Sequence, residues 1–189
     1  MDDRFHLDLV VTGGDELVTP GEVGEAVITS LYSEGTPLIR YRLGDLVQFL
    51  PGPCSCGAPW PRIQIMGRAD QTFFLYDGIK LHGYQVRSAL ARSASHATSY
   101  QAVLRCDEEG VEEIEVILPA SAEGGEEMVK RIEEDLWMCS LDLGAAKDIG
   151  RLRFRVSLNG RFLMTRRGKT PEFVDLRKEG PALMEEVRL

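Results

Sequence analysis

The pattern of apolar and polar residues divides the chain into two parts. In the first, short apolar runs alternate with turn clusters, which predicts strands at 7–12, 24–31 and 38–50. The clusters between them include Gly13-Gly14-Asp15 and Pro20-Gly21. This part is too short to bury a full core of its own. We therefore expect a β-rich lobe that packs against a neighbour.

The second part mixes helical and strand periodicity. Its predicted elements are a hairpin at 72–81, a helix at 84–95, strands at 100–106 and 111–118, a helix at 126–138 and a strand at 151–156. This order is typical of an α+β sandwich of ordinary domain size. The predicted fold class is α+β, with a small β-rich lobe (residues 1–69) followed by a compact α+β domain (residues 70–189).

Composition narrows the range of functions. The 189-residue chain has a formal net charge of −8, which disfavours non-specific binding to nucleic acid. The sequence has no signal-peptide pattern and no apolar run long enough to span a membrane, so we expect a cytoplasmic protein without a membrane partner. Its four cysteines, of which only two are closely spaced, do not form a disulfide framework.

Four short motifs carry the candidate chemistry. They are Tyr41-Arg42-Leu43-Gly44-Asp45, Gly67-Arg68-Ala69-Asp70, Gly78-Ile79-Lys80 and Gly168-Lys169. In order and spacing they resemble the C-terminal part of an AMP-forming acyl-CoA ligase, in the phenylacetate-CoA ligase branch of the adenylate-forming enzymes. The resemblance covers nearly the whole chain. It implies a ligase that activates a carboxylic acid with ATP and Mg²⁺ as an acyl-adenylate and then transfers the acyl group to CoA.

By this resemblance, Asp45 and Arg68 hold the nucleotide, and Tyr41 belongs to the same site. A carboxylate at the end of a strand can accept hydrogen bonds from ribose hydroxyls, and such charge-assisted bonds are strong. The planar guanidinium of arginine suits ribose or phosphate oxygens. For the spacing Arg42-x-x-Asp45 taken alone, the alternative is a surface ion pair.

Asp70 and Gly78 match two conformational features of the family. Asp70 matches the hinge about which the C-terminal domain rotates between the two half-reactions, and the composition changes just here. The alternative is an ordinary turn aspartate. Gly78 matches a glycine beside the pantetheine arm of CoA. Its loop is one residue longer than the family pattern and Gln71 replaces a common second aspartate, so a simple Asp77-Gly78 hairpin turn is the alternative.

Lys169 matches a lysine that acts in adenylation. A positioned ammonium offsets the negative charge that gathers as a carboxylate attacks the α-phosphorus of ATP. The alternative is a solvated lysine near a chain end. No Gly/Ser/Thr-rich phosphate loop occurs in residues 1–189, so we expect part of an active site, inactive alone.

Such a part of an active site requires a partner domain or a second copy of the chain. We expect self-association or a partner domain over the exposed β lobe. The alternative function is a non-catalytic module, derived from such a ligase, that binds a nucleotide or a partner protein.

The remaining cysteines and cations have simpler interpretations. Cys54 and Cys56 would supply half of a tetrahedral zinc site; no metal is the first expectation and zinc at these thiols the alternative. Cys106 and Cys139 lie on predicted buried faces.

Arg151, Arg153 and Arg155 share one strand face, which would either meet CoA phosphates or form the solvated face of an edge strand. Trp60 and Trp137 are predicted to pack in a core or between domains.

Overall fold

The structure is a computed structural model that describes residues 4–94, 99–119, 125–158, 160–177 and 184–187. The chain divides into two compact units, Met1–Asp70 (unit 1) and Gln71–Leu189 (unit 2). Strands and helices alternate through the second unit, so the fold class is α+β, as predicted.

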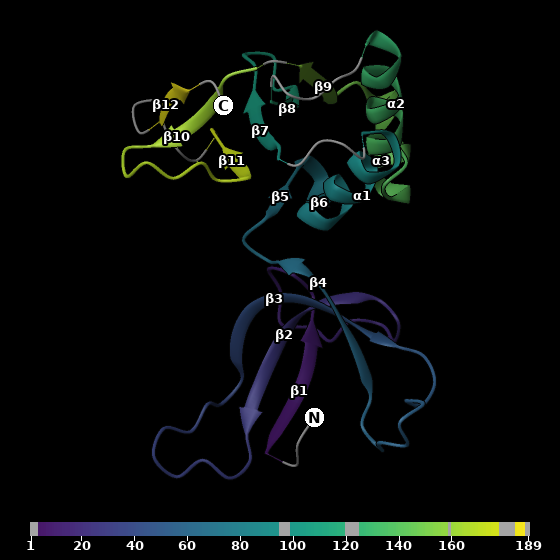
Figure 1. Cartoon of the computed structure of the whole chain (residues 1–189), viewed down its shortest axis with the longest axis vertical. Coiled ribbons are helices and arrows are strands. Elements are labelled where there is room, and N and C mark those ends of the chain that lie inside the picture. Colours follow the sequence, from purple (N-terminus) through teal and green to yellow (C-terminus); the bar gives the residue numbers. More distant parts are fainter. Residues whose placement is uncertain (1–3, 95–98, 120–124, 159, 178–183, 188–189) are drawn as a thin grey trace. The chain divides into compact units, whose positions relative to one another are not determined.

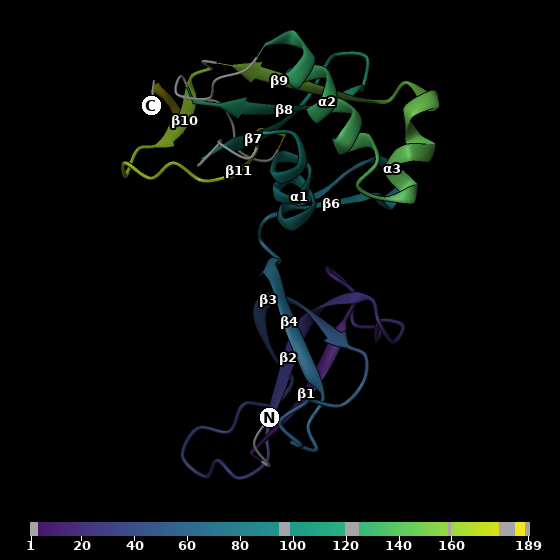
Figure 2. The same ribbon diagram turned by 45° about the vertical axis from the view of Figure 1, so that its right-hand side comes forward.

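Unit 1 is an antiparallel meander in which the four strands pair in the order β1-β2-β3-β4 (Figure 2). Its strands are β1 (Phe5–Val10), β2 (Val23–Ser30), β3 (Tyr41–Leu50) and β4 (Arg62–Arg68). The three predicted strands are confirmed, although β3 begins at Tyr41 because Arg40 adopts a left-handed φ of 46°. Strand β4 was not predicted. Its Ile63 and Ile65 stay exposed, so pairing with β3 rather than burial makes it a strand.

The apolar core of unit 1 is small. Leu9, Ala26 and Val47 form its buried cluster, with a few partly buried neighbours around it. On the same sheet face, Ile65 lies opposite Val47 and is 70% exposed. Part of the apolar face of unit 1 is therefore uncovered within the described residues.

Unit 2 is built on a mixed four-stranded sheet of order β11-β7-β8-β9 (Figure 1). Its elements are β5 (Thr72–Phe74), η1 (Tyr76–Gly78), β6 (Lys80–His82), α1 (Gly83–Ser93), β7 (Gln101–Cys106), β8 (Glu112–Leu118), α2 (Glu126–Trp137), α3 (Leu141–Ala146), η2 (Lys147–Ile149), β9 (Leu152–Leu158), β10 (Phe162–Thr165), β11 (Phe173–Asp175) and β12 (Met184–Val187). Every element predicted here is confirmed, except that the end of the first helix, Ser95, lies outside the described residues.

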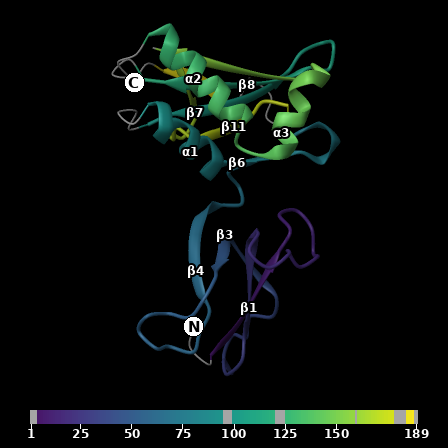
Figure 3. The ribbon, with the colours of Figure 1, turned by 90° about the vertical axis from the view of Figure 1, so that its right-hand side faces the viewer.

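The two faces of this sheet are covered differently. Helices α1 and α2 pack on one face, where Leu90, Leu104, Ile114 and Ile132 belong to the main core (Figure 3). On the other face, residues of β7 and β8 form a second small core with Phe162 of β10. No helix in the described part of the chain is both long enough and apolar enough to cross a membrane.

The placements of four side chains correct or settle predictions. Cys106 is exposed, because it ends β7 beside a turn, whereas Cys139 is partly buried as predicted. Trp60 lies in the loop before β4 and is 40% exposed, so it is not a core residue. Trp137 packs edge-to-face on Phe154, with ring centroids 4.7 Å apart, and so lies against the main core.

The arginine strand face is solvated. Arg151, Arg153 and Arg155 are all exposed, and β9 is an edge strand of its sheet. Arg155 pairs with Glu113 of β8 at 3.0 Å. This exposed, ion-paired face matches the prediction of a charged edge strand.

Because the two units have separate cores, we expect Leu104→Ala to destabilise unit 2 alone, by about 2–5 kcal/mol of unfolding free energy. Trp60 reports unit 1 and Trp137 reports unit 2, so urea unfolding followed by fluorescence in Trp60→Phe and Trp137→Phe backgrounds separates the two transitions. The matched change Val47→Ala should shift only the Trp60 transition. Equal shifts of both transitions by Leu104→Ala would contradict separate cores.

Candidate functional site

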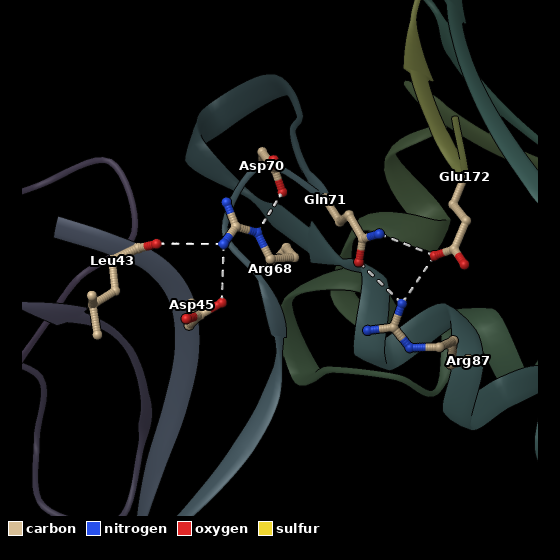
Figure 4. Close-up of polar contacts among 7 residues, drawn as sticks. All are labelled: Leu43, Asp45, Arg68, Asp70, Gln71, Arg87 and Glu172. Atoms are coloured by element: carbon tan, nitrogen blue, oxygen red, sulfur yellow. Dashed lines mark hydrogen bonds and ion pairs between the residues drawn. The ribbon is translucent and has the colours of Figure 1, made fainter. Parts of the chain in front are cut away.

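Arg68 holds two candidate residues together at the end of unit 1. It lies directly opposite Asp45 in the β3–β4 ladder. Its Nη1 is 3.1 Å from Asp45 Oδ1, and its Nε is 3.4 Å from Asp70 Oδ1 (Figure 4). The carboxylates of Asp70 and Asp45 raise the pKa of Arg68, so the guanidinium stays charged. Three residues from two sequence motifs thus form one exposed, charged cluster.

Gly44 leaves room for this guanidinium. It has a left-handed φ of +73°, and a Cβ there would lie 2.9 Å from Arg68 Nη2. The carbonyl of Leu43 also accepts a hydrogen bond from Arg68, at 3.4 Å. The left-handed backbone favours glycine at this position, and the absence of a side chain lets the Arg68 guanidinium approach closely.

Arg42 does not pair with Asp45, so the ion pair that their spacing suggested does not form. It donates to Glu25 at 2.6 Å, to Asp15 at 2.8 Å and to the carbonyl of Gly14. Tyr41 starts β3 with its side chain 53% exposed. The ion pair of Asp45 is instead made by Arg68.

Asp70 lies between two residues whose backbones are held. The Ala69 N–H donates to the Gly44 carbonyl at 2.8 Å within unit 1, and the Gly83 N–H donates to the Gln71 carbonyl at 2.7 Å within unit 2. In the described chain, Asp70 itself has no backbone hydrogen bond, and its side chain is 71% exposed. Asp70 therefore lies between a residue bonded within unit 1 and a residue bonded within unit 2.

Gln71 is fixed firmly inside unit 2. Its side-chain amide donates to Glu172 at 3.0 Å and accepts from Arg87 at 3.1 Å, and Arg87 also reaches Glu172 at 3.2 Å (Figure 4). An aspartate here could accept from Arg87 but could not donate to Glu172. The departure of Gln71 from the family pattern thus makes a three-residue polar cluster.

Gly78 occupies the tip of the β5–β6 hairpin. Asp77 has φ 55° and Gly78 has φ 78°, and the Ile79 N–H donates to the Tyr76 carbonyl at 3.2 Å. This is the hairpin turn that the Asp77-Gly78 pair predicts. No atom lies within 4 Å of a Cβ placed on Gly78, so the turn faces open space.

The base of this hairpin is fixed by a buried ion pair. Glu112 is 6% exposed; it accepts a hydrogen bond from the Tyr76 N–H at 2.9 Å and pairs with Arg177. Arg177 also donates to the Phe74 carbonyl and to Asp175, each at 2.8 Å. Arg177, two residues after Asp175 of β11, therefore fastens the strand that leads into the Gly78 turn.

Lys169 lies on an exposed turn between β10 and β11. The Gly168 N–H donates to the Thr165 carbonyl and the Thr165 N–H to the Lys169 carbonyl, both at 2.8 Å. Gly168 has φ 74°, which the turn requires. The Lys169 side chain is exposed. Gly78 and Lys169 are thus on two different turns of unit 2.

The thiols of Cys54 and Cys56 lie 2.9 Å apart in the exposed loop before β4. Hydrogen bonding to Cys54 lowers the pKa of Cys56. Among the residues that the structure describes, no group of three or more His, Cys, Asp or Glu side chains is placed to hold a metal.

Sequence reasoning missed Gln101 and Glu112, the buried polar residues beneath the Lys169 and Gly78 turns. Both stand at the start of apolar strands, where one polar residue is easily taken for a strand boundary. Their only signal in the sequence is that position.

Comparison with protein-family models finds no match. Among curated proteins, the chain is 30% identical over 188 residues to phenylacetate-coenzyme A ligase of Thermus thermophilus, covering 94% of this chain and 42% of that protein. It is 30% identical over 101 residues to the Pseudomonas putida enzyme of the same name, covering 53% of this chain and 22% of that protein. The chain therefore spans less than half the length of these relatives.

Solved structures agree on the fold. An open conformation of 2-hydroxyisobutyryl-CoA ligase, in complex with 2-HIB-AMP and CoA, matches with TM-score 0.63 and 20% identity over 92% of this chain and 36% of that one. GH3.15 acyl acid amido synthetase matches with TM-score 0.55 and 15% identity, over 82% and 29%. The fold is that of the adenylate-forming CoA ligases. In sequence the chain is similar to phenylacetate-coenzyme A ligase over 94% of its own length, consistent with a C-terminal portion of such an enzyme.

We expect Gly44→Ala to destabilise unit 1 by about 1–3 kcal/mol of unfolding free energy, because the methyl group combines backbone strain with a clash against Arg68. Gly52→Ala is the matched control, since Gly52 has φ +76° but open space around its Cβ position. Urea unfolding followed by Trp60 fluorescence measures both. Equal losses would mean that the guanidinium moves aside freely and that the close approach is unimportant.

His82, at the end of β6, should make the unfolding free energy of unit 2 depend on pH. Its Nδ1 is 2.9 Å from Thr72 Oγ1, and its ring stacks on Tyr84. Burial, with a smaller effect of the Lys80 charge, lowers the pKa of His82 to about 4. Because an unfolded histidine has a pKa of about 6.5, the unfolded chain takes up this proton first as the pH falls.

The contribution of neutral His82 to the unfolding free energy should therefore be fully present above about pH 6.5. It should be lost progressively as the pH falls toward about 4, by on the order of 3 kcal/mol in total. Urea unfolding of unit 2 at several pH values, in wild type and His82→Gln, measures this. His6→Gln, at an exposed histidine of unit 1, is the control. If wild type and His82→Gln lose stability equally on acidification, the histidine is not held neutral.

Proposed function

We propose that this chain forms the ribose-binding, hinge and lysine-bearing part of an AMP-forming acyl- or aryl-CoA ligase similar to phenylacetate-CoA ligase. The observation that carries the proposal is the Arg68 guanidinium, which gathers Asp45 and Asp70 at the end of unit 1. Its support is the similarity to phenylacetate-coenzyme A ligase over 94% of this chain.

In this proposal Asp45 binds the ribose of AMP. Its side chain is 37% exposed and Oδ1 is held by Arg68, so the carboxylate is fixed in direction yet open to a ligand. The vicinal hydroxyls of a ribose donate to such a carboxylate, and Arg68 adds donors for ribose or phosphate oxygens. Tyr41, exposed on the same strand, completes the nucleotide site.

Lys169 acts in the first half-reaction. A carboxylate oxygen attacks the α-phosphorus of ATP, the bond to pyrophosphate breaks, and an acyl-adenylate forms. The ammonium of Lys169 offsets the negative charge of the crowded transition state. For this role the ammonium must be able to reach a phosphate, and Lys169 is an exposed lysine on a hydrogen-bonded turn.

Gly78 acts in the second half-reaction, in which the CoA sulfur attacks the acyl carbon and AMP leaves. Its turn faces open space and has no side chain at the tip, so a slender pantetheine arm can pass close to the backbone. We assign the change between half-reactions to rotation at Asp70, which lies between a residue bonded within unit 1 and a residue bonded within unit 2.

The remaining length of such a ligase would supply the acid pocket, the phosphate-binding loop and the Mg²⁺ ligands. We propose that it also covers the exposed apolar face around Ile63 and Ile65 of unit 1. That same face favours the alternative function, a non-catalytic nucleotide- or partner-binding module, in which a partner protein or a second copy covers it.

Titration calorimetry with AMP tests the ribose site on the chain as it stands. We expect wild type to bind AMP and Asp45→Ala to bind about tenfold more weakly or worse, because a charge-assisted hydrogen bond is lost. Asp8→Ala is the matched control, since Asp8 is also a strand carboxylate paired with an arginine, Arg40. Wild-type chain that binds no AMP, or equal losses in both variants, would reject Asp45 as the ribose ligand.

A further inference from the structure

Gln101 is a fully buried polar side chain directly beneath the Lys169 turn. It is 0% exposed and begins β7. Its Nε2 donates to the carbonyls of Leu163 and Pro171, each at 2.8 Å, and its Oε1 accepts from the Leu163 N–H at 2.6 Å. One side chain therefore binds the backbone before and after the turn that carries Lys169.

The orientation of this amide is fixed by its partners. The Leu163 N–H can only donate, and the carbonyls of Leu163 and Pro171 can only accept, so the oxygen and the nitrogen of Gln101 cannot be exchanged. Both N–H groups are used. No other neutral side chain of this length supplies two donors and one acceptor in this arrangement.

The turn is made of exposed residues between two short strands. Residues 166–170 are all exposed, so no buried side chain anchors them. The flanking elements are short: β10 has four residues and β11 has three. Hydrogen bonds of the described chain that hold the turn include those from Thr165 to the Gly168 and Lys169 backbone within it and those from Gln101 below it.

We propose that Gln101 is a positioning residue for Lys169: its three hydrogen bonds hold both ends of the Arg166–Thr170 turn so that the lysine is presented in one place. The inference rests on the proposed role of Lys169 in adenylation. Gln101 touches no substrate in this role, and it acts only through the backbone of the turn.

The physical reason is entropic. A lysine on a loosely held turn samples many positions, and this conformational entropy is lost when the ammonium binds a phosphate. A turn held at both ends by buried hydrogen bonds has lost this freedom already on folding.

Hydrogen exchange of the loop amides tests the positioning directly. Gln101→Met keeps the volume and burial but removes all three bonds, so we expect protection factors of the Thr165 and Lys169 amides to fall by about tenfold or more. Gln85→Met is the matched control. Gln85 is another buried glutamine of unit 2, bonded to the His82 N–H and the Cys139 carbonyl, away from this turn.

Gln101→Glu adds a second readout, the pH dependence of loop protection, which a general loss of stability would not reproduce. The ionised carboxylate can accept from Leu163 but is repelled by the two carbonyls, whereas the protonated acid can donate to one of them. Loop protection, corrected for intrinsic exchange, should therefore recover as the pH falls from about 8 to about 5 in Gln101→Glu and not in Gln101→Met. Unchanged loop protection, or an equal loss throughout unit 2, would overturn the proposal.

A second arm separates this proposal from the proposed function. Amine labelling of Lys169 is measured by mass spectrometry with and without ATP. In wild type ATP should lower the labelling severalfold, and in Gln101→Met this protection should be lost. If ATP fails to protect Lys169 in wild type while Gln101→Met still loosens the loop, the adenylation role fails and the anchoring by Gln101 stands.

Discussion

The exposed turns of unit 2 depend on hydrogen bonds from buried polar side chains below them. Gln101 holds the backbone on both sides of the Lys169 turn, and Glu112 holds the Tyr76 amide beside the Gly78 turn. A short solvent-exposed turn buries little apolar surface and cannot fix itself by packing. Leaving one buried polar group of such a cluster unpaired costs about 1–3 kcal/mol, so each cluster favours a single arrangement. Residues of the sheet thereby determine the positions of the Lys169 and Gly78 turns.

The cluster of Asp45, Arg68 and Asp70 in unit 1 is exposed, so buried hydrogen bonds cannot fix it. Ion pairs in solvent contribute little energy, typically below about 1 kcal/mol each. Charge alone would not keep Arg68 between Asp45 and Asp70. What keeps it there is the backbone: the ladder sets Asp45 opposite Arg68, and Gly44 leaves the space that the guanidinium occupies. Charge then sets the direction of groups that the strands have already brought together.

The sequence was sufficient for the features that local pattern controls. Alternation and helical spacing predicted the α+β class and most elements, because burial decides those positions. It failed for β4, whose isoleucines stay exposed, for Cys106, and for the core alternative at Trp60, because the exposure of these side chains depends on the neighbouring chain. The partner of Asp45 was also unpredictable locally: Arg42 is nearer in sequence, but Glu25 and Asp15 hold it, and Arg68 arrives from the next strand. Gln101 and Glu112 were missed because their importance comes from bonds to residues far along the chain.

The positions of the two anchors also bear on how the proposed rotation would work. Gln101 begins β7 and Glu112 begins β8, and these strands are neighbours in one sheet, so both turns belong to one rigid framework. Gln71 is fastened to that framework through Arg87 and Glu172, while Ala69 is fastened to Gly44 in unit 1. In the proposed mechanism, rotation at Asp70, which lies between these two held residues, would change which turn meets the nucleotide without deforming either turn. An alternating mechanism then needs no rearrangement inside unit 2, because the buried hydrogen bonds that shape each turn stay intact in both states.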